Sequence, residues 1–226
     1  MKKSLHLVML FALLLIGGCA GNGQFALSNA EKKPQEDEVR LGATGLPRLE
    51  DLMKAGPLPE NTLGKAGAPV TVIEYMSLTC PHCRAFHQKT FPKFKREFID
   101  TGKVRYIVRE FPIGRSAGNA AIVTRCGTVN RTFKMIDLFL NNQRQWVSQD
   151  VRLEAIYNVA KKSGLKRAEF DKCMKDRTLI DGLDWVKKRG RKLGVTGTPT
   201  FFINGQKVRK PLTIEEMRLM IKPHLS

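Results

Sequence analysis

One short motif limits what this chain can fold into more than any other feature of its 226 residues. The tetrapeptide Cys80-Pro81-His82-Cys83 follows residues 70–76, a run rich in β-branched side chains that predicts a buried strand. Proline favours the first position of a helix, so Pro81 predicts that a helix starts at the cysteines. Residues 103–109 alternate in polarity and predict a second strand, which completes the start of a βαβ unit. The sequence therefore predicts an α/β fold with two cysteines at a helix N-terminus.

The order of the remaining patterns divides the chain into five parts. Helical periodicity without a strand signal fills the middle of the chain. Strand patterns return around Asn204-Gly205, a pair typical of a two-residue hairpin turn. A helical subdomain is therefore expected inside the α/β domain. The expected parts are a signal peptide at 1–19, a flexible tether at 20–47, the first part of the domain at 48–112, the helical insertion at 113–178 and the second part of the domain at 179–226.

Several local signals predict where elements begin and end. The stretch 48–69 predicts only one short helix, around 49–54, because prolines and glycines interrupt the rest. Pro92 is expected to kink the helix that follows the cysteine motif. A later helix is expected to fade through Gly190 and Gly194, and Thr213 with the glutamate three residues later forms a capping box for a last helix.

The N-terminus has the pattern of an export signal. Two lysines at positions 2 and 3 precede a short apolar run at 5–16, which is too short for a comfortable membrane span. Small residues then lead to Cys19, in a pattern that resembles a bacterial lipobox, whose cysteine is acylated and becomes the new N-terminus. Ordinary cleavage nearby and a retained membrane anchor are the alternatives. All three interpretations place the folded part outside the cytoplasm.

The cysteine count fits an oxidising compartment. Of five cysteines, Cys19 is either acylated or removed, which leaves an even number. Two of these form the C-x-x-C motif, and Cys126 and Cys173 remain as a natural second pair. We predict a structural disulfide between them; two free, buried cysteines are the alternative.

The chain is strongly basic, with a formal net charge of +18. The basic residues are scattered and lack the aromatic interleaving or the motifs of a nucleic-acid reader. We therefore expect a solvated basic surface and no binding of nucleic acid. A lipid-anchored protein that binds envelope polymers through its charge is an alternative from another functional class.

The placement of the two motif cysteines predicts different roles for them. Unpaired amide donors and the positive end of the helix dipole stabilise a thiolate, so Cys80 should be an exposed nucleophile with a lowered pKa. Cys83 lies one turn further in and should be the buried, resolving thiol. Pro81 fixes the first turn and His82 can place charge near the sulfur. Both effects stabilise the reduced form, which makes the disulfide form an oxidant.

Structural zinc is the main alternative for this cysteine pair. Zinc needs four ligands, normally with a second close pair of cysteines or histidines, and the remaining candidates are isolated. We therefore expect neither a metal nor another cofactor. His87, four residues after Cys83, is interpreted as a surface histidine.

The chain resembles the DsbA-type thiol:disulfide oxidoreductases of the thioredoxin superfamily, and especially the exported DsbA-like proteins of alphaproteobacteria. The residues that carry the resemblance are 72–75, the Cys80-Pro81-His82-Cys83 motif and 197–202. The resemblance implies a thioredoxin fold with a helical insertion. It also implies that Pro199 is a cis-proline facing the dithiol, that the Thr198 backbone pairs with substrate, and that Glu74 is a buried acid that moves a proton for Cys83. A plain strand-edge residue is the alternative for Glu74.

These features together predict a monomeric dithiol oxidase of the periplasm, soluble or lipid-anchored. Its substrates would be reduced exported proteins, and the resemblance implies reoxidation by a membrane partner of the DsbB type. A disulfide isomerase or a reductase is the alternative within the superfamily, because isomerase-type relatives also have a threonine, like Thr198, before the cis-proline. The tether lacks the sustained heptads that would join several heads, which weakens the isomerase interpretation.

Overall fold

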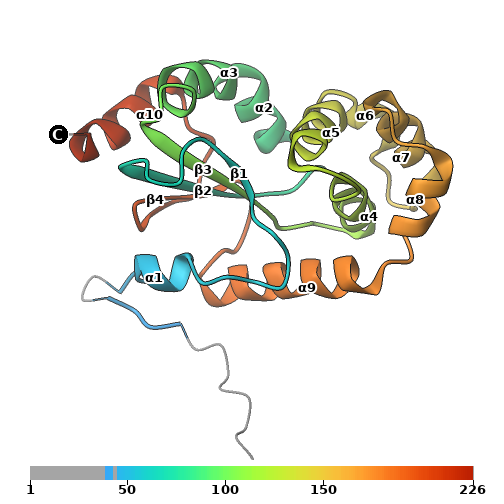
Figure 1. Cartoon of the computed structure of the whole chain (residues 1–226), viewed down its shortest axis with the longest axis horizontal. Helices are drawn as coiled ribbons and strands as arrows, with labels where there is room; N and C mark the ends of the chain where they lie inside the picture. Colours follow the sequence, from blue (N-terminus) through green and yellow to red (C-terminus); the bar gives the residue numbers. More distant parts are fainter. Residues whose placement is uncertain (1–38, 43–44, 226) are drawn as a thin grey trace, which may run out of the picture. The chain divides into compact units, whose positions relative to one another are not determined.

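The computed structural model describes residues 39–42 and 45–225. The expected signal peptide, Cys19 and most of the expected tether lie outside the described residues. The described chain forms a five-stranded sheet with helices on both faces (Figure 1). Within these residues no helix combines the length and apolar character needed to cross a membrane.

The sheet places two parallel strands at its centre. Its order is β1-β3-β2-β4-β5; β2 pairs with β3 in parallel, and every other neighbouring pair is antiparallel. The strands are β1 (Asn61–Leu63), β2 (Val70–Met76), β3 (Val104–Glu110), β4 (Thr200–Ile203) and β5 (Gln206–Val208). The helices are α1 (Leu49–Leu52), α2 (Pro81–Lys89), α3 (Phe91–Phe94), the π-helix η1 (Lys95–Ile99), α4 (Arg115–Thr124), α5 (Val129–Asn141), α6 (Gln143–Trp146), α7 (Leu153–Ala160), η2 (Lys161–Ser163), α8 (Arg167–Cys173), α9 (Arg177–Lys192), α10 (Ile214–Ile221) and η3 (Lys222–His224).

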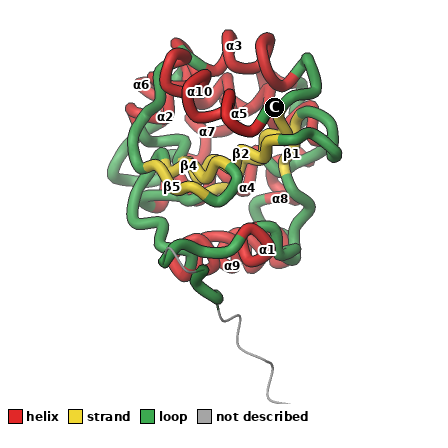
Figure 2. Tube along the Cα trace, turned by 90° about the vertical axis from the view of Figure 1, so that its left-hand side faces the viewer, coloured by secondary structure: helices red, strands yellow, loops and turns green. Residues whose placement is uncertain are grey.

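The sheet lies between two layers of helices, as Figure 2 shows, with α2, α3 and α10 on one side and α1 and α9 on the other. Because side chains alternate along a strand, β2 contributes to both cores. Val72 and Met76 join the core beneath α2, whereas Ile73 and Tyr75 join the core on the α9 side. Glu74 has the same parity as Val72 and Met76, so it lies on the α2 side.

Helices α4 to α8 form an uninterrupted helical segment between β3 and α9, beside the sheet (Figure 1). The expected α/β fold with a helical insertion is therefore confirmed. Helix α5 has its apolar stripe buried at Ile136, Phe139 and Leu140, which the periodicity predicts. The insertion thus has its own packed face toward the domain.

Most local signals are confirmed. The expected strand at 70–76 is observed with the same bounds, and the expected strand at 103–109 is shifted by one residue. Asn204 and Gly205 both have positive φ, 43° and 93°, in the turn between β4 and β5. Thr213 forms the expected capping box. Pro92 ends the continuity of the helix, because α2 stops at Lys89 and α3 begins at Phe91.

Strand β1 is a feature that the sequence interpretation missed. It consists of three residues, Asn61–Leu63, and pairs antiparallel with β3. A strand this short has no usable periodicity, and its partner lies more than forty residues away in sequence, since Asn61 is opposite Val108. Long-range pairing, rather than a local pattern, creates this edge strand.

The end of α9 agrees with the sequence prediction, whereas the end of the tether differs from it. Helix α9 continues to Lys192 and so ends between Gly190 and Gly194, where it was expected to fade. A Cβ atom at Gly190 would lie 2.8 Å from Cε1 of Tyr75, so the glycine lets α9 approach the sheet closely. The last part of the expected tether also contacts the domain, since the backbone N–H of Arg40 donates to Asp51 Oδ2 at 3.2 Å.

Candidate active site

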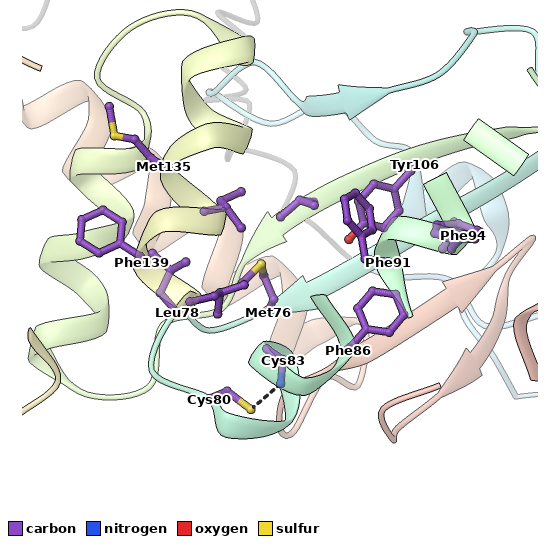
Figure 3. Packing of buried hydrophobic residues seen from close by; sticks show 14 of the residues in the cluster. Met76, Leu78, Cys80, Cys83, Phe86, Phe91, Phe94, Tyr106, Met135 and Phe139 are labelled. Carbon is purple, nitrogen blue, oxygen red and sulfur yellow. Dashed lines mark hydrogen bonds between the residues drawn. The ribbon is translucent and has the colours of Figure 1, made fainter. Parts of the chain in front are cut away.

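Cys80 is the N-cap residue of α2, at the point where the chain leaves β2 and turns into the helix. The backbone N–H of Cys83 donates a hydrogen bond to Cys80 Sγ at 3.4 Å (Figure 3). Both thiols are free. Cys80 is 8% exposed and Cys83 is fully buried. The expectation of an exposed Cys80 is therefore wrong in degree: the residue is mostly buried, and its sulfur lies 3.2 Å from the carbonyl oxygen of Thr198 in the loop before β4.

The two thiols have opposite pKa shifts. The pKa of Cys80 is lowered to about 5. The hydrogen bond from the Cys83 side chain is the largest cause; burial opposes it, while the Thr198 side chain and the backbone N–H groups of Cys83 and His82 add to it. Burial raises the pKa of Cys83 well above its ordinary value, and the nearby Cys80 and Glu74 raise it further. At neutral pH Cys80 is therefore a thiolate and Cys83 a thiol.

We expect the reduced protein to show a thiolate titration with a midpoint near pH 5, because the low pKa belongs to Cys80. Thiolate absorbance in the ultraviolet, recorded from pH 3 to 9, measures it. The Cys80→Ser variant should show no step in this range, since Cys83 titrates well above its ordinary pKa. A midpoint above pH 8 in the wild-type protein would contradict the assignment.

The same shift makes the stability of the reduced protein depend on pH. The folded-state pKa of Cys80 lies below its ordinary value of 9.0, so its contribution is lost as pH falls through 5 and is complete above 9. Between these values stability should rise by at most about 1.4 kcal/mol per pH unit, less the screening by solvent. Urea unfolding of the reduced protein against Cys80→Ser at several pH values checks the direction.

The loop before β4 faces the cysteines, although it lies far away in the sequence. Cys80 Sγ lies 3.2 Å from the carbonyl oxygen of Thr198, across a separation of 118 residues, and donates a hydrogen bond to it when the thiol is protonated. The peptide bond between Thr198 and Pro199 is cis. Strand β4 follows immediately and pairs with β2, so the sheet itself brings the two segments together. Thr198 and Pro199 thus lie beside Cys80.

Glu74 is fully buried in central strand β2, which excludes the strand-edge interpretation. Its Oε2 atom accepts a hydrogen bond from the hydroxyl of Tyr106 on β3. The same oxygen is hydrogen-bonded to Nε2 of His87 at 3.1 Å. The carboxyl group therefore lies beneath α2, close enough to raise the pKa of Cys83 electrostatically.

The interpretation of His87 as a surface histidine is wrong. His87 is only 6% exposed, because it shares a helix face with Cys83 four residues earlier, and that face packs onto the sheet. Its ring also lies against Phe91, with centroids 4.9 Å apart. The spacing from Cys83 could have revealed this position, because residues four apart on a helix share a face.

Two other residues of the site have no clear local signal in the sequence. Tyr106 is fully buried and donates to Glu74. Gln143 of helix α6 donates from Nε2 to the carbonyl oxygens of Leu78 at 2.8 Å and Cys80 at 3.1 Å. The helical insertion thus holds the backbone on which Cys80 is placed.

Pro81 and His82 form the exposed outer part of the motif. The influence of His82 on the pKa of Cys80 comes through its backbone N–H, whereas the sequence suggested its imidazole. Cys126 and Cys173 lie in the insertion and are joined by a disulfide, with Cα atoms 6.0 Å apart. No group of three or more potential metal ligands is assembled in the described part of the chain.

Comparisons with known proteins agree with this geometry. A family model described as thioredoxin matches residues 58–223. The crystal structure of Wolbachia pipientis alpha-DsbA1 superposes with a TM-score of 0.72 at 31% identity, covering 78% of this chain and 95% of that one. The chain therefore belongs to the thioredoxin family, in the DsbA-type branch that its sequence resembles. The structure of BdbD from Bacillus subtilis shares the fold, with a TM-score of 0.67 at 22% identity over 74% of this chain and 92% of that one.

A curated relative shows similar identity over part of its length. A protein of Rickettsia bellii named putative protein-disulfide oxidoreductase is 34% identical over 148 residues, which is 63% of this chain. The match spans 56% of that relative, and 54% of the one from Rickettsia typhi. The chain thus covers little more than half the length of these relatives.

Proposed function

We propose that this protein is an exported thiol:disulfide oxidoreductase that introduces disulfides into reduced proteins. The observation that carries the proposal is the opposite shift of the two thiol pKa values at the α2 N-terminus. A stabilised Cys80 thiolate makes the reduced form of the pair more stable, and the disulfide form is then a strong oxidant. Disulfide would therefore flow from Cys80–Cys83 to substrate.

The chemistry proceeds through a mixed disulfide. A substrate thiolate attacks Cys80 Sγ, the Cys80–Cys83 bond breaks, and Cys83 leaves as a thiolate that takes up a proton. A second substrate thiolate then attacks the substrate sulfur of the mixed disulfide. The substrate leaves with a new disulfide, and Cys80 is released as the thiolate that its low pKa favours. Two electrons pass from substrate to the enzyme pair.

The neighbouring residues have distinct roles in this proposal. Pro81 and His82 shape the first turn of α2 and so tune Cys80, while Glu74 moves the proton of Cys83. The Thr198 backbone and Pro199 hold an extended substrate segment beside the sulfur, where the carbonyl oxygen of Thr198 lies 3.2 Å from Cys80 Sγ. A membrane oxidant of the DsbB type would reoxidise the pair, and the protein would act as a monomer without a cofactor.

Export is the second part of the proposal. The basic and apolar N-terminal residues support a signal peptide, and Cys19 supports a lipid anchor in the periplasm. The disulfide between Cys126 and Cys173 adds support, because such bonds persist in oxidising compartments.

The equilibrium with glutathione tests the direction of transfer. We expect the Cys80–Cys83 pair to have a reduction potential above about −200 mV, within the range of oxidants and isomerases and well above thioredoxin. Mass mapping of trapped thiols assigns the equilibrium to this pair rather than to Cys126–Cys173. A potential near that of thioredoxin, about −270 mV, would overturn the oxidase direction and indicate a reductase.

A further inference from the structure

A surface cavity of about 400 Å³ lies between the end of α2 with α3 and helix α5. Its lining includes exposed polar residues, Gln88, Asp137 and Asn141, so it is accessible to solvent. The buried residue His87 also lines it. The cavity therefore brings water to one side of a histidine whose other side contacts the acid beneath the active site.

His87 and Glu74 each have one buried polar side-chain atom without a hydrogen-bond partner among the described residues. Nε2 of His87 is bonded to Glu74 Oε2 at 3.1 Å, whereas Nδ1 is buried and has no hydrogen-bond partner among the described residues. In the same part of the chain Oε1 of Glu74 is also buried without a partner. Burying a polar atom without a hydrogen-bond partner costs free energy, so each such atom calls for an explanation. These two atoms belong to the two groups that the hydrogen bond between Nε2 and Oε2 joins. The pair can thus pass a proton along without breaking other contacts.

The charged and titratable groups around His87 come from each neighbouring element. Glu74 lies on β2, Tyr106 on β3, Cys83 on α2, Lys95 on η1 and Asp137 on α5. The side chain of Asp137 is exposed on the cavity side but its carboxyl group is partly buried, which raises its pKa, and the nearby His87 opposes that rise. The imidazole is held in place by the rings of two phenylalanines, at positions 86 and 91.

We propose that His87 carries protons between this cavity and Glu74, so that Cys83 gains and loses its proton through the interior rather than past Cys80. The proposal rests on the dithiol chemistry proposed above. When Cys83 leaves as a thiolate, the Nε2 proton of His87 passes to Glu74 and on to the Cys83 sulfur. Nδ1, which is buried in the structure, then takes up one proton from water that enters from the cavity. On reoxidation the proton travels the reverse way. During reduction one proton enters, one S–H bond forms, and the imidazole changes from the Nε2–H to the Nδ1–H tautomer; reoxidation restores the first tautomer.

Chemical rescue tests this role. Oxidised protein is mixed with excess dithiothreitol and the single-turnover reduction of Cys80–Cys83 is followed by tryptophan fluorescence and by trapping of thiols. His87→Ala should react more slowly by on the order of 10²-fold at neutral pH. Added imidazole should restore the rate in a saturable manner, because the cavity at His87 is accessible to solvent. Wild type and Gln88→Ala, a change on the cavity wall, should not respond to imidazole.

His87→Gln is the second variant, because its amide can still donate to Glu74 but cannot carry a proton. It should fold with a similar melting temperature and react as slowly as His87→Ala. A wild-type rate in either variant, or a slow His87→Ala rate that imidazole does not change, overturns the relay. The measurement is separate from the oxidase proposal, because reduction by dithiothreitol requires only the Cys80–Cys83 disulfide. A reduction potential like that of thioredoxin would overturn the proposed oxidase direction, but it would not affect the conclusion drawn from the His87 variants.

Discussion

The Cys80→Ser variant is expected to lose disulfide exchange with a reduced protein substrate by at least on the order of 10³-fold. Cys80 is the thiol whose pKa is lowered to about 5, so at neutral pH it is the ionised sulfur of the pair. A serine hydroxyl neither ionises near neutral pH nor forms a disulfide. Oxidation of a reduced model peptide, followed by mass spectrometry, measures the loss.

Cys83→Ser is the matched comparison, because it changes the other sulfur of the same motif. It retains the Cys80 thiolate but removes the thiol that would resolve a mixed disulfide. After reaction with an activated substrate disulfide, Cys83→Ser should accumulate a stable one-to-one adduct, and Cys80→Ser should form none. The reverse pattern would exchange the roles of the two cysteines.

Removal of the second disulfide should give the largest loss of stability. Cys126 and Cys173 are 47 residues apart, and the chain-entropy model assigns a loop of this length about 4 kcal/mol. The bond ties the chain after α4 to the end of α8, so its loss also frees the insertion. The Cys126→Ala/Cys173→Ala variant should therefore melt roughly 8 to 16 °C lower. Calorimetry and urea unfolding of the oxidised proteins measure both quantities.

A variant with alanine at both Cys80 and Cys83 controls for the loss of two thiols. These two cysteines are only three residues apart, so their disulfide closes a very short loop and constrains little chain entropy. The melting temperature of this variant should therefore change far less. A similar loss in both double variants would indicate packing of sulfur atoms rather than the cross-link. A loss below about 1 kcal/mol in the insertion variant would contradict the entropic argument.

Local signals were sufficient for most of the elements. The β-branched run at β2, the positive-φ pair Asn204-Gly205 and the capping residue Thr213 each act within a few residues of chain. Strand β1 was missed because three residues carry no period and its pairing partner is distant. The end of α9 between Gly190 and Gly194 was predicted, but the close approach of Gly190 to Tyr75 was not, since it depends on how the helix packs on the sheet.

The same distinction between local and long-range interactions applies to the residues of the active site. Cys80 and Cys83 could be assigned from sequence because their chemistry depends on a strand, a turn and a helix that are consecutive. Glu74 and Pro199 were suggested by family resemblance alone. His87 was misassigned, and Gln143, which bonds to the Cys80 carbonyl, had no signal. Each of these contacts joins elements that only packing brings together.

The sequence by itself determined that a dithiol lies at the start of a helix, because the order strand, cysteine, proline is a local property of the chain. Only the tertiary structure decided what surrounds that dithiol. Thr198 approaches Cys80 across 118 residues, and Tyr106 approaches Glu74 across 32. These neighbours remove water and supply hydrogen bonds, so the contrast between a Cys80 thiolate and a Cys83 thiol arises only when the sheet and its helices have packed.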